Sequence, residues 1–427
     1  MNLGKELINV LQRRIFSNNF IKNIGWLGGA QVINRVTRLL TTVVLARTLT
    51  PEDFGLAALV LTTYDFTRIL TMFGIGGKII RSDDDELEEI CNGAYWLNWL
   101  IFLILFVVQI GLAFPIAKFY GNDRLILPIC AIAIVYLVSP FGRIQSILVQ
   151  RENRLKVTAL SHASTLASSN IITAILAFSG LGLWAIVLPK LVTPFIEIYI
   201  YLTHQPWRPS GGFTTQRWGD IFNFGINIMG INLLKTLREN GDYLIIGRFL
   251  GVEELGKYFF AFNAGLGISL TIIQSITVAL YPHLCAARMD FARFKETYFK
   301  SLKTIAMIII PFVILQSSLA SFYVPIIFGG EWVTAIPILI RICLSAIPRP
   351  FEVAANQLLN SIDKPQINLR WSVIFTALFC GALLIGVQGQ SIGVATAVLV
   401  VHWGFPPLFT AWATWYVFYR KVGYAAR

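Results

Sequence analysis

Charged side chains interrupt several long apolar stretches of this sequence, and their chemistry stands out. The nine basic ones are Arg35, Arg38, Arg68, Arg143, Lys190, Lys235, Arg238, Arg341 and Arg349. The five acidic ones are Asp65, Glu197, Glu239, Asp242 and Glu352. A charge at the centre of a membrane helix costs about 2.5–3.5 kcal/mol even on the mildest scale. Such side chains therefore face a wet interior or pair with one another.

Polar residues recur at steps of three or four along three of these stretches, so each set shares one helical face. The first set is Gln31, Asn34, Arg35, Arg38 and Thr42. The second set is Asn223, Asn227, Lys235, Arg238, Glu239 and Asp242. The third set is Arg341, Ser345, Arg349, Glu352, Asn356 and Asn360, in a helix that Pro348 and Pro350 interrupt. Polar stripes on several helices indicate one shared central cavity.

The nine cations outnumber the five acids, so pairing among them leaves a basic surplus. Arginine binds phosphate through two parallel hydrogen bonds, so a basic cavity favours an anionic, phosphate-bearing ligand. We predict that the cavity is lined by Asn34, Arg35, Arg38, Arg68, Asn227, Lys235, Arg238, Arg341 and Arg349. The alternative, which stays open here, is that individual charges form structural ion pairs between two halves of the chain.

The composition sets the environment of these charges. Of 427 residues, 56% are apolar and 14% are charged, and the mean hydropathy is +0.66. Soluble proteins average roughly 45–50% apolar and about 25% charged residues, which excludes a soluble globular enzyme and a disordered chain. The five cysteines and four histidines have no metal-type or disulfide-type spacing, so we expect no metal site.

Twelve membrane-spanning helices are expected to position the polar stripes, since a span needs about 20 mostly apolar residues. They lie near residues 24–44, 55–77, 93–117, 125–149, 157–179, 182–203, 218–240, 254–282, 304–328, 334–360, 368–387 and 391–418. An amphipathic segment over residues 1–22 precedes them. The expected fold is an all-α polytopic membrane protein with two pseudo-symmetric six-helix bundles, residues 23–210 and 211–427, around a central cavity.

The basic residues outside these spans are distributed unevenly. Of the 35 Lys and Arg, 21 lie in the two tails and the even-numbered loops, whereas 5 lie in the odd-numbered loops. Loops rich in Lys and Arg stay in the cytoplasm, so we expect both termini there. The net charge of +12 thus reports membrane topology, and we expect no nucleic acid partner.

One motif occurs twice, 201 residues apart. Residues 45–55 read LARTLTPEDFG and residues 246–256 read IGRFLGVEELG, and each copy lies between the first two spans of its half. We expect Gly55 and Gly256 to allow a tight turn as the next helix begins. Pro51 and the acidic residues after it suit the first turn of that helix. Two six-span halves of equal orientation imply a pseudo-two-fold axis along the membrane normal.

The first motif copy resembles the polysaccharide flippase family. The same resemblance is seen in Gly74-Ile75-Gly76, in residues 242–263 (DYLIIGRFLGVEELGKYFFAFN) and in residues 279–284 (ALYPHL). That family comprises the O-antigen and exopolysaccharide exporters of the multidrug/oligosaccharidyl-lipid/polysaccharide superfamily. The resemblance extends from about residue 23 to residue 419. It implies a bacterial or archaeal protein of the inner (cytoplasmic) membrane that moves undecaprenyl-pyrophosphate-linked oligosaccharides outward by alternating access.

The same resemblance implies the protein's partners and its energy source. The lipid-linked oligosaccharide is the substrate, membrane lipids surround the protein, and glycosyltransferases and a polysaccharide polymerase would act beside it. No bound cofactor is implied, and a proton or sodium gradient would drive transport. The candidate coupling carboxylates are Asp65, Glu239, Asp242 and Glu352.

Other functions fit the sequence less well. A lipid II flippase of the same superfamily would also bind a pyrophosphate lipid, whereas a multidrug or metabolite antiporter would bind organic cations and need an acidic cavity. The major-facilitator fold has a Gly-Asp-Arg-type loop, which the segment GGKIIRSDDDELEE at residues 76–89 lacks. A membrane-embedded glycosyltransferase or polymerase would need large outer loops, and the predicted outer loops are short. We therefore expect that the protein is not an enzyme.

Overall fold

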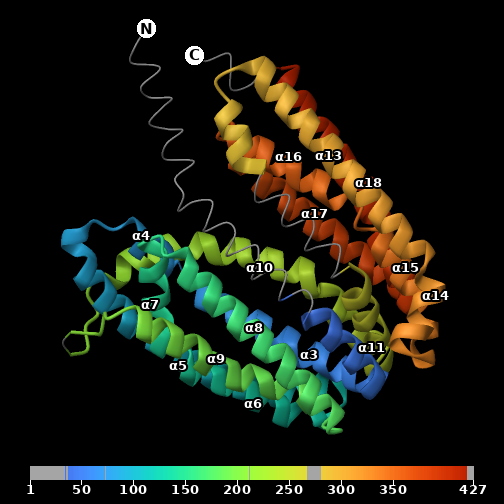
Figure 1. The fold of residues 1–427 in the computed structure, drawn as a ribbon, viewed down its shortest axis with the longest axis horizontal. Coiled ribbons are helices and arrows are strands. Elements are labelled where there is room, and N and C mark those ends of the chain that lie inside the picture. Colours follow the sequence, from blue (N-terminus) through green and yellow to red (C-terminus); the bar gives the residue numbers. More distant parts are fainter. Residues whose placement is uncertain (1–33, 35–36, 73, 211, 267–279, 421–427) are drawn as a thin grey trace. The chain divides into compact units, whose positions relative to one another are not determined.

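A computed structural model describes residues 34, 37–72, 74–210, 212–266 and 280–420 (Figure 1). Every regular element in these ranges is a helix, and none of the residues that the structure describes lies in a strand. The predicted all-α class is therefore confirmed. The predicted amphipathic segment 1–22, and with it Arg35, falls outside the described residues.

The first part of the chain forms seven named helices between residues 51 and 204. They are α3 (Pro51–Arg68), α4 (Ile75–Arg81), α5 (Leu87–Tyr120), α6 (Ile126–Val138), α7 (Pro140–Arg151), α8 (Leu155–Phe178) and α9 (Trp184–His204). The predicted span 55–77 is broken, because α3 ends at Arg68 and Gly74, with a left-handed φ of 75°, precedes α4. The predicted span 125–149 is bent by 55° between α6 and α7, where Pro140 begins the second helix.

The second part contains eight named helices between residues 218 and 418. They are α10 (Trp218–Phe249), α11 (Val252–Ala261), α13 (Phe291–Ser318), α14 (Ala320–Tyr323), α15 (Ile336–Leu344), α16 (Arg349–Ser361), α17 (Pro365–Gly386) and α18 (Gln390–Phe418). The predicted interruption by Pro348 and Pro350 is confirmed, since α15 ends at Leu344 and α16 begins at Arg349. This break places Arg349 and Glu352 in the first turn of a new helix.

One loop prediction was wrong. The basic residues of the expected loop 283–303, among them Arg293, Lys295 and Lys300, lie inside α13, which begins at Phe291. The helix starts early because the Asp290 carboxylate accepts hydrogen bonds from the backbone N–H groups of Ala292 and Arg293. A side chain in this position satisfies donors that a helix terminus otherwise leaves open. The apolar period alone could not locate this helix start, because the first turns of α13 are charged.

The described helices support a multi-pass membrane protein. Six are long and apolar enough to cross a membrane, or seven if the bent pair Asp123–Val138 and Pro140–Arg151 is one span. The helices α8 and α10 hold 24 and 32 residues and are not among the six. Their polar residues lower their hydropathy, and α10 carries the second predicted stripe. The full arrangement of twelve helices in two bundles stays a prediction.

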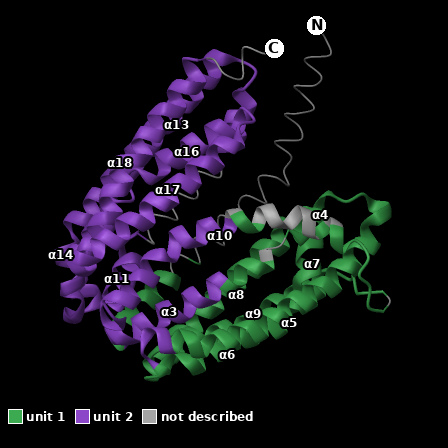
Figure 2. Ribbon diagram, turned by 180° about the vertical axis from the view of Figure 1, so that it is seen from behind, with its two compact units in different colours: residues 1–48, 67–117, 123–230 green, residues 49–66, 118–122, 231–427 purple. Residues whose placement is uncertain are grey.

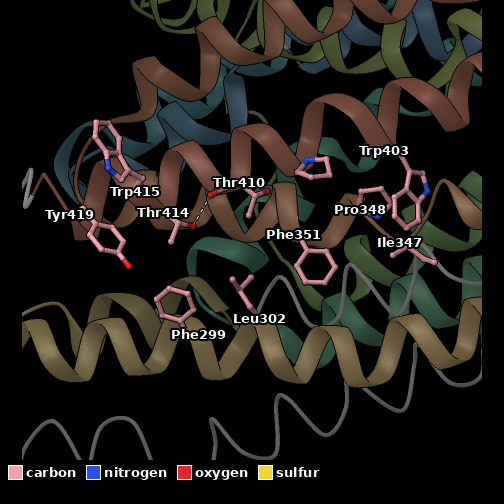
Figure 3. A pocket seen from close by; sticks show the side chains of 12 residues that line it. Phe299, Leu302, Ile347, Pro348, Phe351, Trp403, Thr410, Thr414, Trp415 and Tyr419 are labelled. Carbon is pink, nitrogen blue, oxygen red and sulfur yellow. Dashed lines mark hydrogen bonds between the residues drawn. The ribbon is translucent and has the colours of Figure 1, made fainter.

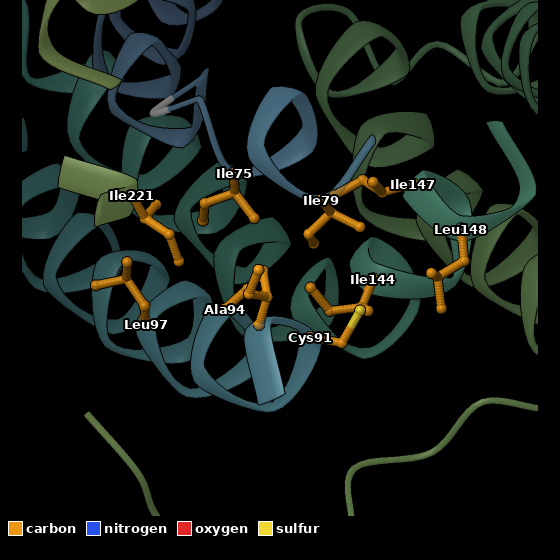
Figure 4. Close-up of a cluster of buried hydrophobic side chains, with 10 residues drawn as sticks. Ile75, Ile79, Cys91, Ala94, Leu97, Ile144, Ile147, Leu148 and Ile221 are labelled. Carbon is orange, nitrogen blue, oxygen red and sulfur yellow. The ribbon is translucent and has the colours of Figure 1, made fainter. Parts of the chain in front are cut away.

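The chain packs into two compact units (Figure 2). Unit 1 contains residues 1–48, 67–117 and 123–230, and unit 2 contains residues 49–66, 118–122 and 231–427. In unit 1, Ile75 and Ile79 of α4 pack against Cys91 and Ala94 of α5 and Ile144 of α7 (Figure 4). Burial of this apolar face fixes the short helix that follows the break after α3. The predicted division of the chain at residue 210 stays a prediction.

The two copies of the repeated motif contact each other inside unit 2. A Cβ atom on Gly55 would lie 1.9 Å from the carbonyl oxygen of Val252, and a Cβ atom on Gly256 would lie 1.7 Å from that of Pro51. Pro51 and Val252 are 201 residues apart, as are the two glycines, so the contact is reciprocal. Small residues let helix backbones approach closely in membrane proteins. We call this contact the repeat seam.

The expected role of these two glycines was wrong in one respect. Gly55 lies inside α3 and Gly256 lies inside α11, so neither forms the turn before its helix. In the second copy, the residue with a left-handed φ is Gly251, at 90°. The motif glycines are instead needed for the close helix–helix approach. The predicted acidic first turn is present in α3, and α11 also has acidic residues in its first turn.

Candidate functional site

Charged and polar side chains from five helices meet inside unit 2, and we call them the unit 2 polar cluster. Its members are Arg238 and Asp242 of α10, Tyr258 of α11, Arg349 and Glu352 of α16, Trp371 of α17 and His402 of α18. Arg238 and Asp242 are four residues apart on α10, and Arg349 and Glu352 are three residues apart on α16. The two charged residues of each helix therefore lie on the same face of that helix. The cluster thus unites four residues of the predicted stripes.

Glu352 is held by two donors. Its Oε1 accepts a hydrogen bond from the Trp371 indole N–H at 2.8 Å and lies 3.9 Å from Nη1 of Arg238. The Glu352 residue is 7% exposed, so its charge is largely shielded from solvent. The Trp371 ring is fixed in turn, because it stacks on Phe409 with centroids 4.3 Å apart and planes 6° apart. Glu352 is therefore an oriented, buried acceptor.

Asp242 is buried more deeply, at 3% exposure. Its Oδ2 accepts a hydrogen bond from the Tyr258 hydroxyl at 2.8 Å, and its Oδ1 accepts one from the backbone N–H of Tyr243 at 2.9 Å. Burial of an ionised carboxylate is costly unless it is paired and hydrogen-bonded. The guanidinium of Arg349 supplies the nearby positive charge.

Arg349 occupies the centre of the cluster. It interacts electrostatically with Asp242, Tyr258, Glu352 and Arg238. Its Nε is buried and has no hydrogen-bond acceptor among the residues that the structure describes. An arginine in the first turn of a helix is disfavoured by the positive end of the helix dipole. Its position is therefore maintained by the surrounding acids, and one of its donors remains unsatisfied.

Two aromatic faces border the basic side chains. The guanidinium carbon of Arg238 lies 5.7 Å from the centroid of the Phe375 ring, a cation–π distance. Phe375 and Phe379 also contact the His402 ring edge-on, at 5.5 and 5.7 Å. His402 is 4% exposed, and its Nδ1–H donates to the Val398 carbonyl oxygen at 2.8 Å. Phenylalanine rings thus border the cluster at Arg238 and His402.

Several predicted residues of unit 2 lie apart from the cluster. Lys235 and Glu239 form a loose pair with an N–O distance of 3.9 Å on an exposed face of α10. The Arg341 guanidinium donates from Nη1 to the Pro337 carbonyl oxygen of its own helix at 2.9 Å. Asn227 lies in α10, and its side chain is outside the described part of the chain. Neither of these two contacts involves Arg349 or Glu352.

The predicted residues of unit 1 form separate groups. Arg143 interacts electrostatically with Glu197 and with Arg68. Asn34 accepts a hydrogen bond from the Asn170 amide at 3.5 Å, which joins the first predicted stripe to α8. Arg38 and Lys190 of unit 1 are exposed, whereas Asp65 is half-buried and belongs to unit 2, and each of the three has partners of its own.

Sequence reasoning missed three members of the cluster. Tyr258, Trp371 and His402 belong to none of the three predicted polar stripes. His402 has no charged neighbour in sequence, and its position next to two phenylalanine rings depends on the packing of α17 against α18. Tyr258 lies two residues after the second copy of the repeated motif, and this was the one available signal.

The acidic run at residues 83–89 pairs with arginines elsewhere in unit 1. Arg217 contacts Glu86 at 2.8 Å and Glu89 at 3.3 Å. The hydrogen bond to Glu89 and the charge of Glu86 raise the pKa of the Arg217 guanidinium. Arg151 pairs with Asp84 at 2.7 Å. These contacts fix loop ends and lie outside the polar cluster.

The described residues contain no group of three or more His, Cys, Asp and Glu side chains that could hold a metal ion. Two arginines and two carboxylates make up the charges of the unit 2 polar cluster. The positive and negative charges are equal in number, and their pairing is loose. An incoming anion can therefore replace a carboxylate as the partner of an arginine, and the arginine stays inside the protein. The arrangement is suited to binding and releasing charged groups.

Comparison with known proteins places this geometry in context. A family described as "Polysaccharide biosynthesis protein" matches residues 44–337. The teichuronic acid biosynthesis protein TuaB of Bacillus subtilis (strain 168) is 24% identical over 337 residues, which are 77% of this chain and 68% of TuaB. The lipopolysaccharide biosynthesis protein WzxC of Escherichia coli (strain K12) is 26% identical over 386 residues, 90% of this chain and 78% of WzxC.

Solved structures share the fold at lower identity. An inward-facing multidrug resistance MATE family transporter of the MOP superfamily aligns with a TM-score of 0.75 and 13% identity, covering 90% of this chain and 95% of that one. The lipid II flippase MurJ in an inward closed conformation aligns with a TM-score of 0.71 and 13% identity, covering 91% and 87%. These alignments show that the chain shares the fold of the two proteins.

Proposed function

Because this chain belongs to the polysaccharide biosynthesis protein family, we propose that it is a flippase for a lipid-linked oligosaccharide. Its substrate is a glycan on a polyprenyl pyrophosphate, and it moves this lipid from the cytoplasmic to the outer leaflet by alternating access. The names of TuaB and WzxC support a role in cell-surface polysaccharide synthesis. The shared fold of MurJ, a lipid II flippase, supports a lipid-linked substrate.

The pair of arginines in the unit 2 polar cluster is the observation that carries the proposal. Arg349 keeps a buried Nε–H without an acceptor among the described residues. Arg238 approaches Glu352 only to 3.9 Å, which is long for an ion pair. Both guanidinium groups therefore retain donors for a further anion, and guanidinium binds phosphate oxygens through paired hydrogen bonds. The pyrophosphate is the anionic group that all substrates of this class share.

Carboxylates in the same cluster offer a route to energy coupling. A pyrophosphate bound to the arginines would compete with Asp242 and Glu352 for the same donors. A buried charge that loses its partner is strongly destabilising, so the released carboxylates would take up a proton or a sodium ion. Glu239 is exposed beside Lys235 and therefore has weaker support as a coupling residue, whereas Asp65 stays a candidate from the sequence.

The proposal includes the membrane orientation and the partners expected from the sequence. Both termini lie in the cytoplasm of a bacterial or archaeal cell, because the tails and the even-numbered loops hold 21 of the 35 basic residues. Glycosyltransferases then build the substrate on the side where the protein collects it. A polymerase on the opposite side would use the product.

A transport assay with purified protein tests the proposal. The protein is reconstituted in liposomes with a fluorescent polyprenyl-pyrophosphate glycan, and the fraction that reaches the opposite leaflet is measured. We expect Arg238→Gln and Arg349→Gln each to slow transport about ten- to a hundredfold, since a charge-assisted hydrogen bond contributes about 1.5–3 kcal/mol. Arg341→Gln is the matched control, because Arg341 bonds to its own helix and should retain near wild-type transport.

The outcomes also separate the alternatives. Unchanged transport in both cluster variants would contradict the role of the arginines. Movement of organic cations in preference to the pyrophosphate lipid would favour a multidrug antiporter. A longer glycan in the product would favour a polymerase. Transport that stops when only the proton gradient or only the sodium gradient is collapsed would identify the coupling ion.

A further inference from the structure

An elongated groove runs along one side of unit 2, apart from the polar cluster. It has a volume of about 590 Å³ and is lined by residues of α13, α16 and α18 and of the break before α16 (Figure 3). Its walls are mostly aromatic and aliphatic, and they include Phe299, Leu302, Phe351, Trp403, Pro407 and Trp415. Among the residues that the structure describes, none of those lining it is acidic. In a membrane protein, an open apolar groove of this kind is suited to a hydrocarbon chain.

One end of the groove is both basic and aromatic. The Lys295 ammonium lies 5.4 Å from the centroid of the Tyr419 ring, and the Arg420 guanidinium lies 5.0 Å from that of the Trp415 ring. Lys295 is four residues before Phe299 and seven before Leu302, so it lies on the groove face of α13. Tyrosine and tryptophan side chains gather at the headgroup level of a bilayer. This end therefore presents two positive charges at the depth of lipid headgroups.

The length of the groove matches one leaflet of a bilayer. Trp403 and Tyr419 mark its two ends on α18 and are sixteen residues apart, which is about 24 Å along a helix. Half of a bilayer including its headgroups is about 20–22 Å thick. The inner end is formed by Ile347 and Pro348, close to the middle of the candidate span Gly330–Ser361. The groove thus reaches from the headgroup level to the membrane centre.

We propose that this groove binds one anionic phospholipid from the leaflet in which α18 ends. The phosphate lies between Lys295 and Arg420, and an acyl chain follows the aromatic wall toward Trp403. A transported polyprenyl chain would extend beyond one leaflet, whereas the groove ends at the membrane centre. The site is thus a place for a resident lipid of the bilayer and is distinct from the arginines of the polar cluster.

Charge complementarity favours an anionic over a zwitterionic headgroup. Each Lys or Arg near an anionic membrane surface contributes about 1 kcal/mol to its attraction. Two such side chains at one end of an apolar groove therefore favour an acidic phospholipid over a neutral one of equal chain length. None of the described residues that line the groove carries a carboxylate that would offset this attraction.

Lipid titration monitored by native mass spectrometry tests the proposal. The delipidated protein is titrated with phosphatidylglycerol, phosphatidylcholine and a polyprenyl phosphate. We expect preferential binding of one phosphatidylglycerol and a loss of affinity of about fivefold for each of Lys295→Gln and Arg420→Gln, the factor that about 1 kcal/mol represents. Ala411→Trp, which fills the exposed groove wall of α18, should weaken binding of this lipid irrespective of headgroup charge.

Lys300→Gln is the matched control, because Lys300 is exposed on another face of α13. It should leave phosphatidylglycerol affinity within twofold of the wild type. An equal loss of affinity in this control would mean diffuse surface attraction and would overturn the proposal. So would unchanged binding in Ala411→Trp. Preferential binding of the polyprenyl phosphate, with loss in the same variants, would assign the groove to a transported lipid and would also overturn it.

Discussion

Replacement of Gly256 by alanine should push apart the two copies of the repeated motif. The new Cβ atom would lie 1.7 Å from the Pro51 carbonyl oxygen, whereas real Cβ contacts are essentially never below 3.0 Å. The obstacle is backbone rather than a flexible side chain, so α11 or α3 must move by more than 1 Å. Gly55→Ala should have the same effect, because its Cβ atom would lie 1.9 Å from the Val252 carbonyl oxygen.

The expected magnitude follows from two opposing effects. Overpacking of a tight contact typically costs about 1–3 kcal/mol. A helical Gly→Ala change otherwise stabilises a protein by up to about 1 kcal/mol. Gly111 of α5 provides the reference, since a Cβ atom there would meet no atom within 4 Å. We therefore expect Gly256→Ala to be less stable than Gly111→Ala by about 1–3 kcal/mol.

Thermal unfolding of the purified protein in detergent is the assay. The melting temperature should fall in Gly55→Ala and in Gly256→Ala, and it should stay equal or rise in Gly111→Ala. The double variant Gly55→Ala/Gly256→Ala should lose less stability than the sum of the single losses, because one displaced helix relieves both contacts. Single variants as stable as Gly111→Ala, or strictly additive losses, would refute a reciprocal repeat seam.

Further variants test the interior of both units. Trp371→Phe retains the stacking on Phe409 but removes the donor to Glu352, so it should lower the free energy of unfolding by about 1.5–3 kcal/mol, measured by thermal unfolding. Asp242→Asn should fold normally but abolish the dependence of transport on an ion gradient, and retained dependence would contradict its coupling role. In unit 1, Tyr136→Phe removes a 2.7 Å hydrogen bond to a buried threonine and should destabilise the protein by about 0.5–1.5 kcal/mol.

Much of the helical architecture was predictable because apolar length and helix breakers are local signals. The break before α16 followed from Pro348 and Pro350, and the acidic first turn of α3 followed from the residues after Pro51. The repeat seam was not predictable, because Gly55 and Gly256 satisfy no local requirement that the sequence displays. Their need for glycine arises only when two helices 201 residues apart meet.

The candidate site was predictable to the same limited depth. Helical spacing placed Arg238 and Asp242 on one face and Arg349 and Glu352 on another. Helical spacing does not predict which stripes lie against each other in the folded protein. It also grouped Arg341 with Arg349 and Glu352, which Arg341 does not contact. The donors that orient the carboxylates, Tyr258 and Trp371, come from other helices and become visible only with the packing. Local sequence thus identified the charges, while tertiary contacts selected the cluster.

The most direct measurement compares two lipids that differ only in the pyrophosphate. Proteoliposomes receive the same fluorescent glycan either on a polyprenyl pyrophosphate or on an uncharged polyprenyl ether, and transbilayer movement of each is followed. We predict that the protein moves the pyrophosphate lipid and leaves the uncharged lipid at the rate of protein-free liposomes. Equal movement of both lipids, or movement of neither under an imposed proton or sodium gradient, would contradict the proposal that this protein is a flippase for pyrophosphate-linked glycans.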